Sequence, residues 1–182
     1  EIKECDWSSD VCSSDLQRQQ TVLVDLDLTA NDCAMHVGAS PQHTLQEVGE
    51  NLSRMDQALF EGLVSRDPLG FLLVSPPDQI DHRFLFNEPM FRDFANFLVE
   101  HYQSIVVDAG RWLADEVVLA ALQSSATIFL VTTQQFPAIR NAQRYITGLM
   151  RLGFNQDQLK LDRKSTRLNS SHIPLSRMPS SA

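Results

Sequence analysis

Cysteine is scarce in this 182-residue chain, which contains only three. Cys5 and Cys12 lie in a serine-rich N-terminal stretch, so Cys33 is the one cysteine of the central part. That excludes a disulfide framework in the central part and is typical of a reducing compartment. No apolar run approaches the roughly 18 residues that a membrane helix needs, and the N-terminus lacks the basic and then apolar layout of a signal peptide. We therefore expect a cytoplasmic protein with no membrane segment in this chain.

Positive charge is also in short supply, with 15 Lys and Arg against 23 Asp and Glu and a formal net charge of −8. Residues 17–161 carry 10 of these cations and 17 of the acids, a difference of −7, so the acidity belongs to the central part. An acidic domain offers no broad surface for a phosphate backbone, and we predict no direct nucleic-acid partner. Arg140, Arg144 and Arg151 would form a basic stripe on one helix, a pattern that is most often a solvated face.

Hydrophobic periodicity is absent from both ends of the chain, residues 1–16 and 162–182. These 37 residues hold ten serines, whereas the 145 residues between them hold seven. Strings such as DWSSDVCSSDL and RKSTRLNSSHIPLSRMPSSA resemble translated sequencing-adapter sequence. We therefore interpret both ends as non-native flanks, and residues 17–161 as part of one domain with no internal repeat or linker.

The central part alternates short apolar runs with amphipathic stretches. The runs predict strands at Thr21–Leu28, Gly70–Val74, Ser104–Asp108 and Thr127–Thr132, with a fifth beginning at Lys160. The stretches predict helices at Glu88–Gln103, Trp112–Gln123 and Pro137–Leu152, after helical spacing between residues 45 and 63. This alternation indicates an α/β fold, a parallel sheet with helices on both faces.

Three acidic residues stand at the predicted carboxyl ends of strands: Asp25 and Asp27 in the first, and Asp108 in the third. Reacting groups of parallel α/β sheets lie beyond these ends, where a carboxylate can serve Mg²⁺ or its water in nucleotide hydrolysis. The alternative is that the aspartates cap the following loops by accepting backbone N–H groups. Asp25 and Asp27 would share one side of the strand if it stays extended. Cys33 belongs to no motif and, like Trp112, is expected to be a packing residue.

The order of these motifs resembles the MinD/ParA superfamily of P-loop ATPases, whose Walker motif is deviant. The resemblance spans residues 21–161 and runs through VLVDLDL, PQHTLQEVGENL, LFEGLVSRDPLGFLLVSPP, SIVVDAG, DEVVLAAL and IFLVTTQQFPAIRNAQRYITGLMRLG. The segment VTTQQFPAIRNAQR favours the CpaE/TadZ type, which is associated with pilus assembly and polar localisation.

The resemblance implies a role for each of the three carboxylates. Asp27 matches the switch aspartate that orients the attacking water, and is the expected catalytic residue. Asp25 matches the carboxylate before it in the same motif, near the nucleotide. Asp108 matches the Walker B aspartate, which holds Mg²⁺ through water. The intact parent is thereby expected to use Mg²⁺ and ATP, to form a homodimer, and to act as a positional switch with pilus-assembly or secretion proteins.

The phosphate-binding loop of that family is where the resemblance stops. A Lys-Gly-Gly-x-Gly-Lys-Thr/Ser loop would precede Thr21 by a helix and a turn, yet no glycine occurs before Gly38. We expect the chain to lack the P-loop and the first strand, which in the family lies beside the Walker B strand. The chain alone is then expected to bind no cofactor, to be marginally stable and not to hydrolyse ATP. Two alternatives stay open: a non-enzymatic polar-localisation scaffold with a degenerate nucleotide site, and a chromosome- or plasmid-partitioning ATPase.

Overall fold

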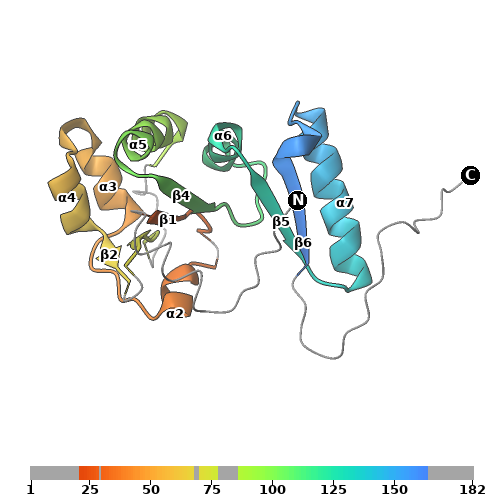
Figure 1. Ribbon diagram of the computed structural model, residues 1–182, viewed down its shortest axis with the longest axis horizontal. Coiled ribbons are helices and arrows are strands. Elements are labelled where there is room, and N and C mark those ends of the chain that lie inside the picture. Colours follow the sequence, from red (N-terminus) through yellow and green to blue (C-terminus); the bar gives the residue numbers. More distant parts are fainter. Residues whose placement is uncertain (1–20, 29, 68–69, 78–85, 164–182) are drawn as a thin grey trace, which may run out of the picture. The chain divides into compact units, whose positions relative to one another are not determined.

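The computed structural model describes residues 21–28, 30–67, 70–77 and 86–163. The chain divides into two compact units, one up to Ser124 and one from Ser125 onward. The first holds a four-stranded sheet with its helices, and the second holds a two-stranded sheet and one long helix (Figure 1). None of the described helices has the length and apolar character needed to cross a membrane. Strands and helices alternate in both units, which confirms the predicted α/β class.

The sheet of the first unit has the strand order β2-β3-β1-β4. Its strands are β1 (Thr21–Asp25), β2 (Ser65–Arg66), β3 (Leu72–Val74) and β4 (Ser104–Asp108). β1 is parallel to both β3 and β4, whereas β2 is antiparallel to β3. The predicted parallel sheet is therefore corrected to a mixed one, because the short connection from β2 to β3 cannot form the crossover that a parallel pair requires.

β1 is shorter than the predicted strand, which extended to Leu28. It ends at Asp25 because the side chain of Asp25 accepts the N–H of Asp27 at 2.9 Å, which bends the backbone into a turn. The N–H of Leu28 then donates to the carbonyl of Leu26 at 3.0 Å. The alternation of an extended strand stops before Asp27, so the expected placement of Asp25 and Asp27 on one side of the strand does not follow.

The helices of this unit are α2 (Cys33–Val37), α3 (Leu45–Asn51), the 3-10 turn η1 (Leu52–Arg54), α4 (Gln57–Leu63), α5 (Glu88–His101) and α6 (Glu116–Ser124). The N-cap of α5 is Asn87, whose side chain accepts the N–H of Met90. α6 begins four residues later than predicted, because Asp115 accepts the N–H groups of Val117 and Val118 and so fixes the first turn.

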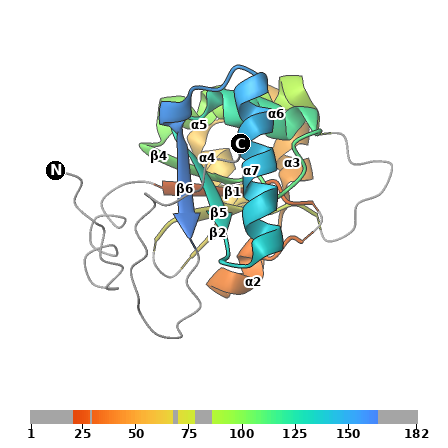
Figure 2. The same cartoon turned by 90° about the vertical axis from the view of Figure 1, so that its right-hand side faces the viewer.

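Helices α3 to α6 lie on one side of the sheet in both views (Figures 1 and 2). Alternate residues of β1, Val22 and Val24, are fully buried and belong to the same apolar cluster as Leu45 and Val48 of α3 and Phe94 of α5. Burial of large apolar side chains contributes about 1.5–3 kcal/mol each, so this cluster is the main source of stability.

Aromatic rings form the centre of that cluster. The ring centroid of Phe60, in α4, lies 5.8 Å from that of Phe94, 5.4 Å from that of Phe97 and 5.5 Å from that of Tyr102. The tilted and edge-on orientations are those that aromatic quadrupoles prefer. Phe60 therefore joins α4 to the middle of α5 and to the residue that follows α5.

Tyr102 brings a hydroxyl into this apolar cluster, and the hydroxyl has no hydrogen-bond partner among the residues that the structure describes. We expect Tyr102→Phe to raise the free energy of unfolding by about 1 kcal/mol, because an unsatisfied buried polar group costs about 1–3 kcal/mol. Burial also raises the pKa of Tyr102 to about 12 from its usual 10.0. As pH rises through this range the unfolded chain releases the phenol proton before the native protein does, so the native protein loses stability. The Tyr102→Phe variant has no phenol proton and should not show this loss. Urea unfolding measures both effects. The pH dependence provides the control: the stability gained by Tyr102→Phe should grow as pH rises above the usual tyrosine pKa of 10.0. An unchanged or lower stability of Tyr102→Phe would contradict the assignment.

The second unit pairs β5 (Ile128–Thr132) in parallel with β6 (Leu159–Arg163). Between them run α7 (Phe136–Arg151) and the 3-10 turn η2 (Gln156–Gln158). The predicted fourth strand, long helix and fifth strand are all confirmed. β6 begins one residue before the predicted start at Lys160 and includes Asp162 and Arg163, which follow the predicted end of the domain at Leu161. The predicted basic stripe of α7 is exposed, and its three arginines line one surface of the helix.

Candidate functional site

The carboxyl ends of β1 and β4 bring two of the predicted site residues together. The two strands are parallel neighbours, and their register places Asp25 directly opposite Asp108. The N–H of Leu26 continues the pairing by donating to the carbonyl of Asp108 at 2.8 Å. Two carboxylates therefore emerge side by side at the edge of the sheet where α/β proteins place their chemistry.

Asp25 is fully buried and held by the backbone of the following loop. Its Oδ1 accepts the N–H of Asp27 at 2.9 Å, and its Oδ2 accepts that of Cys33 at 3.4 Å. Burial raises the pKa of Asp25 above its usual 3.8, an effect that the hydrogen bonds partly oppose and the nearby charge of Asp108 increases. The capping alternative thus describes one part of what Asp25 does: it fixes the loop that carries Asp27 and Cys33.

Asp108 is half-buried at the end of β4. Its Oδ1 accepts the N–H of Gly110 at 3.0 Å, and its Oδ2 lies 3.4 Å from Sγ of Cys33, which donates to it. The carboxylate is therefore oriented by one backbone group and one thiol. Lone pairs remain on both oxygens for a further ligand.

Cys33 is the site residue that sequence reasoning missed, since it was expected only to pack. It is the first residue of α2, and the turn after β1 brings its thiol between Asp25 and Asp108. One ligand atom from each of these three residues lies within 4.8 Å of the other two. Burial, followed by the charges of Asp25 and Asp108, raises the pKa of the Cys33 thiol. No sequence motif surrounds Cys33, and only the folded loop reveals its place.

Asp27 lies beside this cluster, outside β1, and is half-buried. Its Oδ1 accepts the N–H of Ala30 at 3.2 Å. Gly110 packs directly against it: a Cβ added at Gly110 would lie 2.7 Å from Cγ of Asp27. The backbone of Gly110 has a φ of +60°, which favours glycine. The loop after β4 therefore contacts the side chain of the predicted switch aspartate closely.

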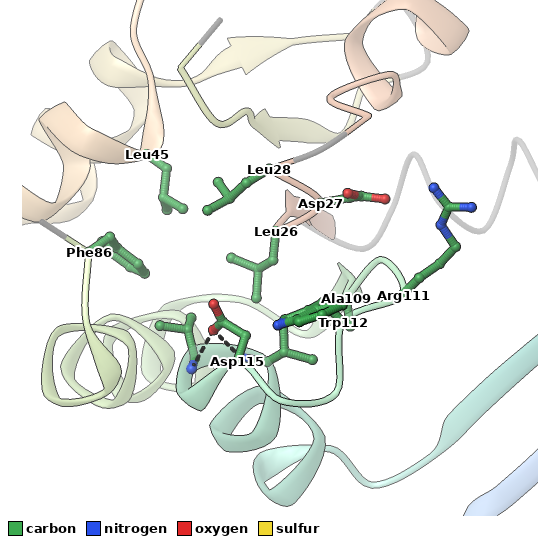
Figure 3. Close-up of a pocket in the computed structure, with 11 residues that line it drawn as sticks. Leu26, Asp27, Leu28, Leu45, Phe86, Ala109, Arg111, Trp112 and Asp115 are labelled. Atoms are coloured by element: carbon green, nitrogen blue, oxygen red, sulfur yellow. Dashed lines mark hydrogen bonds between the residues drawn. The ribbon is translucent and has the colours of Figure 1, made fainter. Parts of the chain in front are cut away.

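A cavity of about 170 Å³ opens beside Asp27 (Figure 3). Its walls are mostly apolar, and its lining includes Leu26, Leu28, Leu45, Phe86, Ala109 and Val118, together with Asp27, Arg111, Trp112, Asp115 and Val117. Asp27 and Arg111 lie at one side and Leu45 and Phe86 at the other. Trp112 was expected in the core, but its side chain is 70% exposed. The loop after β4 carries it outward because α6 begins only at Glu116.

Comparison with known proteins gives matches among solved structures alone, since no protein-family profile and no curated protein matches the chain. A ParA family ATPase from Chlorobium tepidum TLS matches with a TM-score of 0.75 at 18% identity, over 83% of this chain and 63% of that one. The fold is that of the ParA and MinD ATPases. A MinC:MinD cell division complex from Aquifex aeolicus matches with a TM-score of 0.58 at 18% identity, over 83% and 59%. MinD from Pyrococcus horikoshii OT3, complexed with Mg-ADP, matches with a TM-score of 0.58 at 16% identity, over 79% of this chain and 55% of that one.

The chain spans less than two thirds of the length of each of these ParA and MinD proteins. The TM-scores of 0.58–0.75 show that the fold is shared, and at identities of 16–18% the likeness shows the fold alone. The chemistry of the site has to be argued from its own residues.

Mg²⁺ accompanies the nucleotide in one of these solved proteins, so the residues present here can be tested against that ion. Asp108 fits a Mg²⁺ ion held through water, because its half-buried carboxylate keeps acceptor capacity after binding Gly110 and Cys33. Direct contact of one Mg²⁺ with Asp25, Cys33 and Asp108 does not fit. Mg²⁺ demands near-octahedral oxygen ligands, and Cys33 offers sulfur.

Proposed function

We propose that this chain is part of a ParA/MinD-type ATPase in which Asp25, Asp27 and Asp108 form the acidic side of the nucleotide site. The register that sets Asp25 opposite Asp108 at the carboxyl edge of the sheet carries this proposal. A solved protein of the same fold is complexed with Mg-ADP, which supports a nucleotide as the ligand.

Each carboxylate has a distinct task in this proposal. Asp27 orients the attacking water and is held for it by the N–H of Ala30 and by contact with Gly110. Asp108 would hold Mg²⁺ through water, and Asp25 anchors the loop that carries Asp27 and Cys33. Bound Mg²⁺ would supply neutralisation of the phosphate charge.

Within the family we propose the CpaE/TadZ type, a cytoplasmic, homodimeric, nucleotide-dependent positional switch for pilus assembly or secretion. The sequence VTTQQFPAIRNAQR, which spans the end of β5 and the first part of α7, supports this branch. A solved neighbour is a MinC:MinD complex, which supports a protein partner for the switch. We propose further that the chain as given does not hydrolyse ATP, since no glycine precedes Gly38 to form a phosphate loop.

The alternative of a non-enzymatic scaffold gains support from Cys33. Its thiol occupies a hydrogen-bonding position on Asp108, the carboxylate that would serve Mg²⁺. In a scaffold that does not bind Mg-nucleotide, Oδ2 of Asp108 can be occupied by the thiol without loss of function. The partitioning ATPase is less favoured, because residues 17–161 carry an excess of seven acids.

The test starts with sequencing the source DNA outward from the codons for residues 21–161, followed by expression of the complete reading frame. We expect a glycine-rich, lysine-containing loop upstream and slow Mg-dependent ATP turnover by the full-length protein. Asp27→Asn and Asp108→Asn should each lower kcat by roughly 10²-fold or more, while Asp32→Asn, an exposed carboxylate of the same loop, should not.

Three outcomes would change the proposal. Native upstream sequence without the loop, together with no turnover, would replace the ATPase by the scaffold. Turnover that survives both Asp27→Asn and Asp108→Asn would remove their assigned roles. Turnover by the 182-residue chain itself would refute its proposed inactivity.

A further inference from the structure

The donor set at Asp25, Cys33 and Asp108 is unusual for a nucleotide site because it mixes sulfur with oxygen. The three side chains come from the end of β1, the start of α2 and the end of β4, which are far apart in sequence. Their ligand atoms nevertheless converge to within 4.8 Å of one another. Two carboxylates this close repel each other unless a proton or a cation lies between them.

One pair of donors has the spacing that a small tetrahedral ion requires. With Zn–S of about 2.3 Å and Zn–O of about 2.0 Å, tetrahedral angles place sulfur and oxygen about 3.5 Å apart. Sγ of Cys33 and Oδ2 of Asp108 lie 3.4 Å apart. Both oxygens of Asp25 already accept a backbone N–H, which fixes the carboxylate without exhausting its lone pairs.

We propose that Asp25, Cys33 and Asp108 form a direct-contact site for a thiophilic divalent cation, of which Zn²⁺ is the natural candidate. Three protein ligands leave a fourth tetrahedral position for water. When the ion binds, the S–H bond of Cys33 breaks, sulfur bonds the metal and the proton passes to solvent. Neither nucleotide nor the P-loop is needed for this. In the proposed ATPase, an ion bound here would occupy Asp108 and so prevent it from holding Mg²⁺, which would inhibit ATP hydrolysis. This inhibition rests on the proposed function.

Co²⁺ is the probe, because its bond to a thiolate gives a ligand-to-metal absorption band that oxygen ligands do not produce. The protein is the full chain carrying Cys5→Ser and Cys12→Ser, so that Cys33 is its only thiol. We expect the band to saturate at one equivalent of Co²⁺ and to disappear when Zn²⁺ is added, whereas excess Mg²⁺ should leave it unchanged.

Variants assign the ligands. Cys33→Ser should abolish the band, and Asp108→Asn should weaken Co²⁺ binding by roughly 10–100-fold, the scale on which even supporting residues of a metal site act. Asp32→Asn removes the same charge one residue from the thiol but outside the cluster, and should leave Co²⁺ affinity unchanged. Absence of the band, or a band that survives Cys33→Ser, would overturn the proposal.

A second measurement needs no substitution in the cluster and so does not depend on a variant folding. Alkylation of Cys33 is followed by mass spectrometry in the same Cys5→Ser, Cys12→Ser chain. Zn²⁺ should slow the reaction at least tenfold and Mg²⁺ should not, while equal rates would count against a site there. Mg-ADP binding by the full-length protein is measured separately, so failure of the metal site is distinguishable from failure of the ATPase proposal.

Discussion

Replacement of Phe60 by alanine should lower the free energy of unfolding by about 3–5 kcal/mol, the cost of truncating a buried aromatic ring. Phe60 is fully buried, and its ring meets those of Phe94, Phe97 and Tyr102. No single neighbour can fill the space that the ring would leave, since the contacts come from several directions. Domains have only about 5–15 kcal/mol of net stability, so the variant should be close to unfolded at room temperature. Urea unfolding followed by circular dichroism measures the change.

The matched control is Phe136→Ala, which deletes the same ring at a position where it is 80% exposed. We expect a change within about 0.5 kcal/mol there. Equal losses of unfolding free energy for the two variants would show that the aromatic cluster is not the core between the sheet and its helices.

Gly110→Ala should destabilise the protein by roughly 2–5 kcal/mol and displace Asp27. About 1–2 kcal/mol is the cost of a Cβ in the left-handed region, and overpacking adds about 1–3 kcal/mol. The added methyl would lie 2.7 Å from Cγ and 2.9 Å from Oδ2 of Asp27, closer than any real contact. Urea unfolding again gives the change in stability.

Gly38→Ala separates the two contributions. Gly38 has a similar φ of +70°, but a Cβ there meets nothing within 4 Å, so it should cost only about 1–2 kcal/mol. Cβ of Asp27 would itself lie 2.9 Å from the added methyl, so glycine rather than alanine is needed at position 27 to remove the obstruction. Asp27→Gly should relieve Gly110→Ala by roughly the overpacking cost, about 1–3 kcal/mol, in a double-mutant cycle. If the two substitutions are additive, the contact between Gly110 and Asp27 has no energetic weight.

Hydrophobic pattern predicted much of the fold, because most elements bury one continuous stripe or run. β4 matches its predicted range fully, and α5 and α7 match within two residues. The predictions failed where side chains interact with the backbone. Asp25 ends β1 early by accepting the N–H of Asp27, and Asp115 delays α6 in a similar way. Apolar periodicity carries no information about these polar local contacts.

The candidate site was predictable only in part. Strand ends that close on aspartate placed Asp25 and Asp108 at one edge, and parallel pairing then brought them opposite each other. Cys33 could not have been found in this way. Its position depends on the path of the turn after β1, which the hydrogen bonds of Asp25 determine. The close contact of Gly110 with Asp27 likewise depends on the geometry of two loops that are distant in sequence.

The place of β4 at the end of its sheet has a consequence for the solution behaviour of the chain. Among the described residues of the first unit, β4 pairs with β1 alone, and its central side chain, Val106, is 51% exposed. A strand edge with unpaired backbone groups and apolar side chains can recruit a strand from another molecule. Intermolecular strand pairing depends on protein concentration, whereas folding does not. Dilution should therefore favour the native monomer over aggregates that form at β4, so the chain should be purified and refolded at low protein concentration.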